Sequence, residues 1–239
     1  MISKPLIIKE LKDIFREKTL LSMMLIPLVV FSFMLPIIVV FNLDTVKEFS
    51  NIFIGKDIRH IGIYMSSVLL IIPIMISNTF CAYSIIGEKE KNTFESLFCT
   101  PLSIKEIINS KIFACIMISS VITIISFLTY SLVLNISSFV FLNENNLFII
   151  PIDLFVLAIL LIFTSSILVT IFAYKFNTAK GAQQLGIILV VPLAVTLFNI
   201  NLIDNRYIII VLICLLFCVN LILLRYIYKT FNYENILIN

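Results

Sequence analysis

Hydrophobic and charged positions alternate along the chain in long blocks. Six stretches carry no charged residue: 19–43, 61–87, 112–143, 154–174, 181–203 and 207–224. An α-helix rises ~1.5 Å per residue, so about 20 apolar residues cross the ~30 Å hydrocarbon layer of a membrane. The pattern therefore predicts six transmembrane helices, at 20–41, 61–86, 112–134, 150–174, 182–200 and 207–225.

The first residues follow a different pattern. Within 3–18, four apolar side chains recur at i, i+4, i+7 and i+8, namely Ile7, Leu11, Ile14 and Phe15. Most of the Lys and Arg side chains of the segment lie away from this stripe, which is typical of a helix in the headgroup plane of a membrane. We therefore expect an N-terminal amphipathic interfacial helix over 3–18. The alternative is a charged extension without membrane contact.

The composition agrees with a membrane protein and excludes an ordinary soluble domain. Of the 239 residues, 61% are hydrophobic and 13% are charged, and the mean hydropathy is +1.13. A soluble domain carries roughly a quarter charged residues. No internal repeat, low-complexity run or linker divides the chain. The expected fold class is thus an all-α membrane protein whose residues 1–239 form a single transmembrane domain.

The distribution of basic residues predicts the orientation. If the N-terminus is cytoplasmic, 13 of the 17 Lys and Arg residues fall in cytoplasmic segments and four in outer loops. This positive-inside bias predicts a multi-pass protein of the cell membrane with both termini in the cytoplasm. The net charge of +3 therefore reports orientation in the lipid bilayer and gives no support to nucleic-acid binding.

The residues for several kinds of chemistry are missing from the sequence. No spacing of the five glycines forms a phosphate-binding loop, so this chain is not expected to hydrolyse ATP. The single histidine, His60, is expected at an outer membrane boundary. Of the five cysteines, Cys99 lies in a predicted cytoplasmic loop, and the four in or beside the spans are interpreted as small buried hydrophobic residues. We expect no catalytic residue, no metal site and no cofactor bound by this chain. No ionisable residue occupies the middle of a predicted span, which argues against a carrier driven by protons or ions.

The segment 87–111, between the second and third spans, has the densest pattern of motifs. Gly87 is expected to end the second span. Asn92 with Glu95 is a cap-like pair, and Ser103 with Glu106 is a capping box, so a short helix is predicted between two long ones. A solvated connector is the alternative, but it requires neither two capping signals nor a group of exposed apolar side chains.

This segment resembles the signature of the ABC type-2 permease family. The matching positions are Gly87, Glu88, Glu90, Thr93, Glu95, Leu97, Thr100, Pro101 and Lys111. Asn92 stands where the family usually has glycine. The resemblance implies a six-span exporter-type fold in which residues 87–111 form a coupling loop that docks on a separate ABC ATPase subunit. ATP and Mg²⁺ would then be held by that partner.

A line of polar side chains follows one face of the third span. Its members recur at i, i+4, i+7 and i+11: Ser119, Thr123, Ser126 and Tyr130. The functional interpretation is a translocation path lined by hydroxyl groups. Close helix packing favours small hydroxyl residues at the same spacing, and it is the stronger interpretation because this enrichment is general in membrane bundles.

Two functions fit these observations. The first is the permease subunit of an ATP-driven ABC exporter, which pairs with a second copy or a related permease chain around a path for a peptide or bacteriocin, a drug or another amphipathic compound. The second is a non-transporting membrane scaffold or immunity protein that recruits a cytoplasmic partner through the same loop. The two differ in whether the ATPase activity of the bound partner responds to a substrate.

Overall fold

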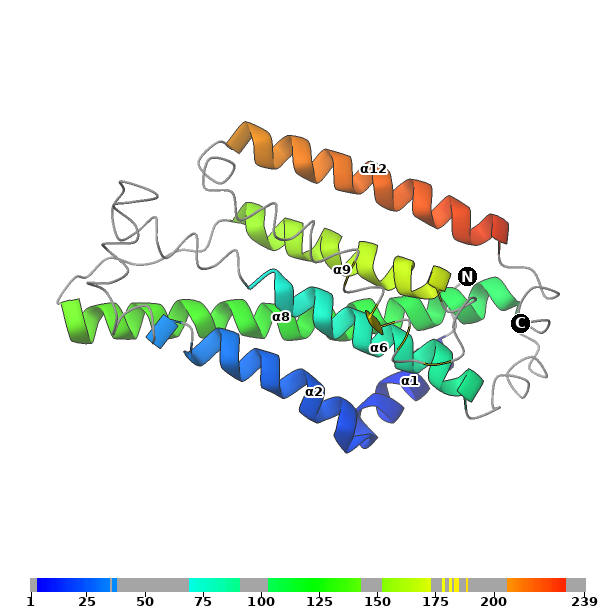
Figure 1. Ribbon diagram of the computed structural model, residues 1–239, viewed down its shortest axis with the longest axis horizontal. Coiled ribbons are helices and arrows are strands. Elements are labelled where there is room, and N and C mark those ends of the chain that lie inside the picture. The colour runs from blue at the N-terminus through cyan, green and yellow to red at the C-terminus, as the bar shows by residue number, and fades with distance from the viewer. Residues whose placement is uncertain are drawn as a thin grey trace.

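The computed structural model is built from long helices (Figure 1). It describes residues 4–34, 36–37, 69–90, 103–142, 152–172, 178, 181, 183–184, 188 and 206–230. In chain order the main elements are α1 (Lys4–Arg16), α2 (Lys18–Val29), the π-helical turn η1 (Val30–Met34), α6 (Ile71–Glu90), α8 (Ile104–Leu142), α9 (Ile152–Phe172) and α12 (Arg206–Thr230). All of these elements are helical, as the composition predicts.

Helices α6, α8 and α9 pack against one another and form the centre of the bundle. Helix α12 lies on the outer side of α9, while α2 and η1 lie on the opposite side against α6 and α8 (Figure 1). The most apolar window of α6 is 78% buried, against 17% for that of α12. Helix α6 is therefore the central element, and α12 is peripheral in the single chain.

Four of the described helical segments are long and apolar enough to cross a membrane: Ile71–Glu90, Lys105–Ile136, Ile152–Phe172 and Ile209–Ile227. They coincide with the predicted second, third, fourth and sixth spans. The predicted first span corresponds to the shorter apolar helix Leu20–Met34. Most of the predicted fifth span, 182–200, lies outside the described residues, so the total of six remains a prediction.

Two helices continue beyond the predicted ends of their spans. Helix α6 does not stop at Gly87 but continues to Glu90, and Gly87 is buried inside it. A Cβ atom added at Gly87 would meet no neighbour closer than Tyr83 Cδ1 at 4.0 Å, so no close approach requires glycine here. Helix α8 likewise continues past residue 134, the predicted end of the third span, to Leu142. Within it, the Asn135 amide donates to the Ser131 carbonyl oxygen of its own helix at 2.9 Å.

The predicted start of the helix that leads into the third span is confirmed in detail. The Ser103 backbone N–H donates to Glu106 Oε2 at 3.1 Å, and the Glu106 N–H donates to Ser103 Oγ at 3.3 Å. This reciprocal pair is the capping box that the sequence predicts. It opens a helix of 39 residues, about 58 Å long at ~1.5 Å per residue, which exceeds the hydrocarbon thickness.

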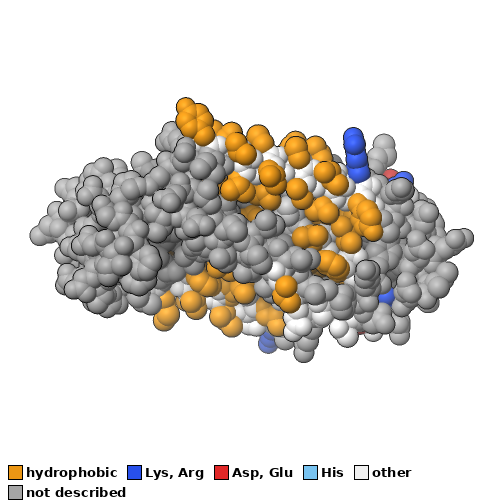
Figure 2. Space-filling view, turned by 45° about the horizontal axis from the view of Figure 1, so that its top comes forward, with side chains coloured by type: hydrophobic (Ala, Val, Ile, Leu, Met, Phe, Trp, Pro, Cys, Tyr) orange, Lys and Arg blue, Asp and Glu red, His pale blue; other side chains and the backbone are white. Residues whose placement is uncertain are grey.

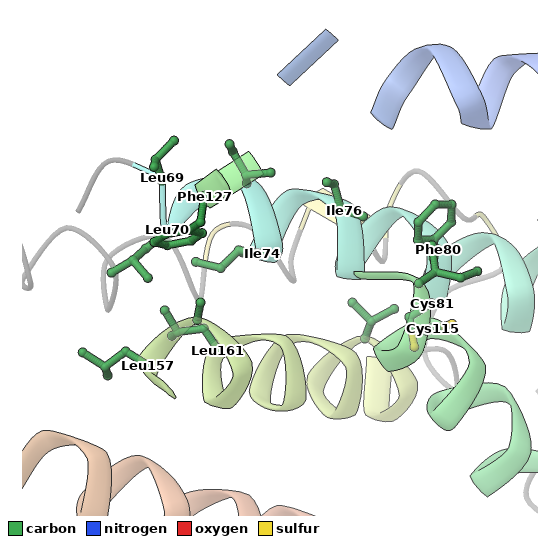
Figure 3. Close-up of a cluster of buried hydrophobic side chains, with 14 of the residues drawn as sticks. Leu69, Leu70, Ile74, Ile76, Phe80, Cys81, Cys115, Phe127, Leu157 and Leu161 are labelled. Atoms are coloured by element: carbon green, nitrogen blue, oxygen red, sulfur yellow. The ribbon is translucent and has the colours of Figure 1, made fainter. Parts of the chain in front are cut away.

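The core lies between α6, α8 and α9. Figure 3 shows buried side chains of all three helices in one cluster, where Cys81 of α6 and Cys115 of α8 lie side by side. Phe127 meets Phe155 edge to face, with ring centroids 6.2 Å apart. Both cysteines are buried as expected, whereas Cys214 and Cys218 lie exposed on α12, which corrects the interpretation of these two.

Small polar groups connect α6 to α9 within this core. The Ser77 hydroxyl donates to the Ile162 carbonyl oxygen at 3.2 Å, and the Cys81 thiol donates to the Ser166 carbonyl oxygen at 3.3 Å. These contacts are one helical turn apart on each helix. Small residues of this kind let two membrane helices approach closely.

The surface of the described part agrees with a membrane environment. Figure 2 shows hydrophobic side chains over the middle of the molecule and Lys or Arg side chains at its margins. The exposed apolar side chains include Leu128 and Leu132 of α8 and Ile222 of α12. Such exposed apolar side chains suit contact with lipid rather than with water.

Candidate functional site: an ionic junction at the α1 end

Five side chains from three helices meet at the end of the bundle where α1 lies. They are Lys9 and Glu10 of α1, Ser84 and Glu88 of α6, and Lys111 of α8, and we call this cluster the ionic junction. Its α6 members are one turn apart on one face of the helix. Its α8 member lies two turns after the capping box.

Lys111 is the centre of the ionic junction. Its Nζ donates to Glu10 Oε1 at 2.7 Å and to the Ser84 carbonyl oxygen at 2.6 Å. It also lies 2.7 Å from Glu88 Oε2, in an ion pair that does not have the alignment of a hydrogen bond. One ammonium group therefore holds α1, α6 and α8 together.

The remaining contacts complete the cluster. The Ser84 hydroxyl donates to the second carboxylate oxygen of Glu10, Oε2, at 2.7 Å. Lys9 Nζ donates to Glu88 Oε1 at 3.1 Å. The charges thus alternate in the order Lys9, Glu88, Lys111, Glu10, and two positive charges balance two negative ones.

The ionic junction runs from the surface into the interior. Side-chain exposure is 49% at Lys9 and 15% at Glu88, but 6% at Glu10 and 1% at Lys111. Removing such charges from water costs several kcal/mol per ion, and their attraction must offset that cost. Because the inner pair cannot exchange its partners for water, it fixes the relative position of α1 and α8.

Electrostatics favour the charged form of Lys9. Burial lowers the pKa of Lys9, but the hydrogen bond and the charge of Glu88, with the charges of Glu10 and Asp13, outweigh that effect. The pKa of Lys9 therefore stands above its ordinary value of 10.5. Throughout the physiological pH range Lys9 stays protonated and keeps its hydrogen bond to Glu88 of α6.

The ionic junction lies at both ends of the predicted coupling loop. Glu88 precedes the end of α6 at Glu90, and Lys111 follows the start of α8 at Ile104. Any displacement of the two helix ends beside segment 91–102 must therefore move α1 or break a buried ion pair. This arrangement suits the transmission of force from a bound partner into the bundle.

The structure describes part of the predicted coupling residues. Gly87 is buried and Glu90 is exposed at the end of α6, while Glu88 faces Lys9 and Lys111. The others lie outside the described residues: Thr93, Glu95, Leu97, Thr100 and Pro101. Contact of these positions with an ATPase subunit stays a prediction.

A helix forms where the interfacial helix is predicted, but its buried face is shifted. Ile14 is buried, Ile7 and Leu11 are half-buried, and nothing is described of the Phe15 side chain. The fully buried positions are Leu6, Glu10 and Ile14, at i, i+4 and i+8, and they face α8 and its neighbours. The position of α1 at a membrane surface stays a prediction.

Sequence reasoning missed Glu10 and Ser84 and treated Lys111 only as part of a motif. One signal was present, because Glu10 lies one turn from Leu6 and one turn from Ile14, inside an apolar face. A carboxylate in such a position needs a buried cation. The identity of that cation was hidden, since Glu10 and Lys111 are 101 residues apart in sequence.

The hydroxyl stripe of α8 lies inside the single chain. Ser119, Thr123, Ser126 and Tyr130 are all fully buried. The Ser119 hydroxyl donates to the Cys115 carbonyl oxygen, and the Ser126 hydroxyl donates to that of Thr123, both at 2.8 Å. Hydroxyls bonded within their own helix are typical of close packing, and a role of the stripe in translocation stays a prediction.

Comparison with models of protein families identifies the family of this chain. Residues 10–173 match the family model described as fluoroquinolones export permease protein Rv2686c-like. This match covers more than half of the 239 residues. The chain belongs to this family. Searches of curated proteins and of solved structures gave no match.

The matched range of the export permease family begins at Glu10 and ends beside α9. It includes Glu10, Ser84, Glu88 and Lys111, and thus nearly all of the ionic junction. It does not include α12, which is the least buried of the four described helices that could cross a membrane. The family relationship therefore covers the central helices and the junction that connects them to α1.

Proposed function

We propose that this chain is the membrane-spanning permease subunit of an ATP-driven exporter of fluoroquinolone-like drugs. Membership of the export permease family supports the transport of a drug. The permease works as a pair, with a second copy or a related chain, and a separate ABC ATPase subunit docks on residues 87–111. The proposal narrows the substrate from amphipathic compounds in general to planar aromatic drugs.

The ionic junction is the observation that carries the mechanism. It joins the two helix ends beside segment 91–102 to α1 through buried ion pairs. When nucleotide binding closes the ATPase subunits, they press on this segment and displace the ends of α6 and α8. Since both ends are held to α1, the three helices move together and change the side to which the path opens.

The energy source is consistent with the placement of charges. In the described helices α6, α8 and α9, charged side chains lie toward the helix ends: Glu88 is in the last turn of α6, Lys111 is two turns into α8, and Asp153 is in the first turn of α9. A carrier driven by protons or ions uses ionisable groups within its spans. An external ATPase requires none there.

The test is to purify the protein gently through a C-terminal tag and identify the ATPase that co-purifies. The docking variant is Glu90→Lys, at the exposed end of α6, because Glu88→Lys would break the ionic junction itself. The matched control is Asp153→Lys, in the first turn of α9 at the other end of the bundle. We expect recovery of the ATPase with wild type and with the control, and reduced recovery with Glu90→Lys.

Drug export is measured in the same cells. Expression of wild type should lower the accumulation of ciprofloxacin, a fluoroquinolone, in an ATP-dependent manner. If wild type recovers no ATPase and does not change drug accumulation, the exporter proposal is wrong. The scaffold or immunity interpretation would then be the better one.

A further inference from the structure

One buried amide in the centre of the bundle lacks hydrogen bonds. Asn78 of α6 is fully buried, and in the part of the chain that the structure describes neither its Oδ1 nor its Nδ2 atom has a hydrogen-bond partner. Its neighbours are satisfied: the Ser77 hydroxyl donates to Ile162, and the Thr79 hydroxyl donates to Met75 and accepts from Gln183 Nε2 at 2.9 Å. Of these three successive residues, only Asn78 lacks hydrogen-bond partners for its side chain.

A polar side chain on a helix can satisfy its donor by bonding to the backbone carbonyl oxygen one turn earlier. Asn135 of α8 donates to the carbonyl oxygen four residues earlier, and so do the hydroxyls of Ser119 and Thr170. Asn78 does not make the corresponding bond to Ile74. Among the other buried groups without a partner, Ser32 has one such atom, and Asn220 still donates to the Leu160 carbonyl oxygen. Asn78 alone among the described residues leaves a whole amide unpaired.

The position of Asn78 makes this unfavourable. It lies 12 residues before the end of α6 at Glu90, or about 18 Å along the helix axis, and thus deep in the apolar part of a span. An unpartnered amide in such surroundings lowers the folding equilibrium constant roughly tenfold or more. Buried groups of this kind need a specific explanation, and a ligand that supplies the missing bonds in another state is one.

We propose that Asn78 is a substrate-contacting residue whose amide hydrogen-bonds the exported drug. This inference rests on the proposed function and names a residue of its path. A fluoroquinolone carries a ring ketone and an adjacent carboxylate, which are acceptors for the Asn78 Nδ2 donor. It also carries a protonated amine, which can donate to Oδ1. The resting packing holds the amide without partners, and the drug provides them when α6 separates from its neighbours.

The ionic junction supplies a connection between this amide and the ATPase. Ser84 and Glu88 lie six and ten residues beyond Asn78 on the same helix, about 9 and 15 Å along its axis. A displacement imposed at Glu88 and Lys111 is therefore carried along one continuous helix to Asn78. Force at the α1 end and access to the amide are linked through α6.

The first test is thermal stability, and it requires no substrate. Asn78→Leu replaces the amide by an apolar group of similar shape, so the purified protein should melt roughly 2–4 °C higher than wild type. The matched control is Ser77→Ala, which removes a hydroxyl that has a partner and should not raise the melting temperature. If Asn78→Leu lowers the melting temperature as a normal core substitution does, the amide has a partner in the resting state and the proposal fails.

The second test is drug binding to the reconstituted permease with its ATPase. Ciprofloxacin is fluorescent, so binding can be followed by the anisotropy of the drug. We expect about tenfold weaker binding for Asn78→Leu, since one or two hydrogen bonds are lost. Asn78→Gln, which keeps the amide, should recover part of the affinity, and Ser77→Ala should bind like wild type.

The outcomes separate the two proposals. If wild type binds ciprofloxacin and Asn78→Leu binds it equally well, the role of Asn78 is wrong while the proposed function stands. If wild type with its ATPase does not bind the drug, the proposed substrate is wrong and the role of Asn78 falls with it.

Discussion

The ionic junction makes a quantitative prediction for Lys111. Replacement of Lys111 by Met removes the ammonium group that contacts Glu10, Ser84 and Glu88. Glu88 still has Lys9 at 3.1 Å and some exposure to water, so it contributes little to the loss. Glu10 is 6% exposed and keeps only the Ser84 hydroxyl among the contacts described here. The cost therefore comes mainly from a carboxylate that stays buried without its cation.

The magnitude follows from comparable buried pairs. Removing one partner of such a pair costs about 3–5 kcal/mol. For a chain of this size, 1 kcal/mol shifts the melting temperature by roughly 2–4 °C, so Lys111→Met should melt about 10 °C below wild type. The double variant Lys111→Met with Glu10→Gln removes both charges and should recover a large part of this loss, because the buried carboxylate is gone.

Thermal unfolding in detergent, followed by circular dichroism, measures both effects. Lys105→Met is the matched control, since Lys105 lies exposed near the start of the same helix, and it should stay within about 2 °C of wild type. A double variant whose loss equals the sum of the two single losses would refute the reasoning, because coupled partners are not additive. A Lys111→Met protein with the same melting temperature as the Lys105→Met control would also refute it.

Three further predictions test neighbouring features. The pKa of Lys9 in the folded protein is raised above 10.5. The stabilisation from its ion pair with Glu88 is therefore fully present below pH 10.5 and is lost as the pH rises through the pKa of the folded state. The difference in melting temperature between wild type and Lys9→Met should vanish only in strongly alkaline buffer. Ser103→Ala removes half of the capping box, so α8 should lose helix at its start and the melting temperature should fall by about 2–4 °C in the same assay. Ser126→Ala should leave the dissociation constant for ciprofloxacin unchanged, since its hydroxyl is bonded within α8, and a tenfold weakening would show instead that the stripe lines the path.

Four of the six predicted spans could be recognised from the sequence because each is a long apolar block without charged residues. Four described helices coincide with predicted spans, since a block without charges that is long enough to cross the bilayer has few alternatives to a helix. The capping box at Ser103 was equally predictable, because both of its partners lie within four residues. Local patterns of this kind contain the information that determines the structure.

The helix ends and the ionic junction were not predictable in the same way. The edge of the hydrocarbon layer does not end a helix, so α6 continues through Gly87 and α8 continues past Asn135. The pairing of Glu10 with Lys111 depends on how three helices pack, and no local pattern specifies it. The lack of hydrogen-bond partners at Asn78 could not be predicted from the sequence either, since an amide can be identified as unpaired only when all of its neighbours are known.

The two unusual features of the bundle occupy the same helix, and this bears on mechanism. Helix α6 is the most buried of the four described spans, and it carries a charged contact at one end and an unpaired amide in its interior. A helix that served only as structural support would be more stable with apolar residues at both places. The ion pairs hold the end of α6 to α1 and α8, while the unpaired amide weakens its interior packing. Helix α6 is held firmly at its end and packed less favourably in its middle. Force applied at its end can therefore move it, and a ligand that hydrogen-bonds Asn78 can stabilise the moved state.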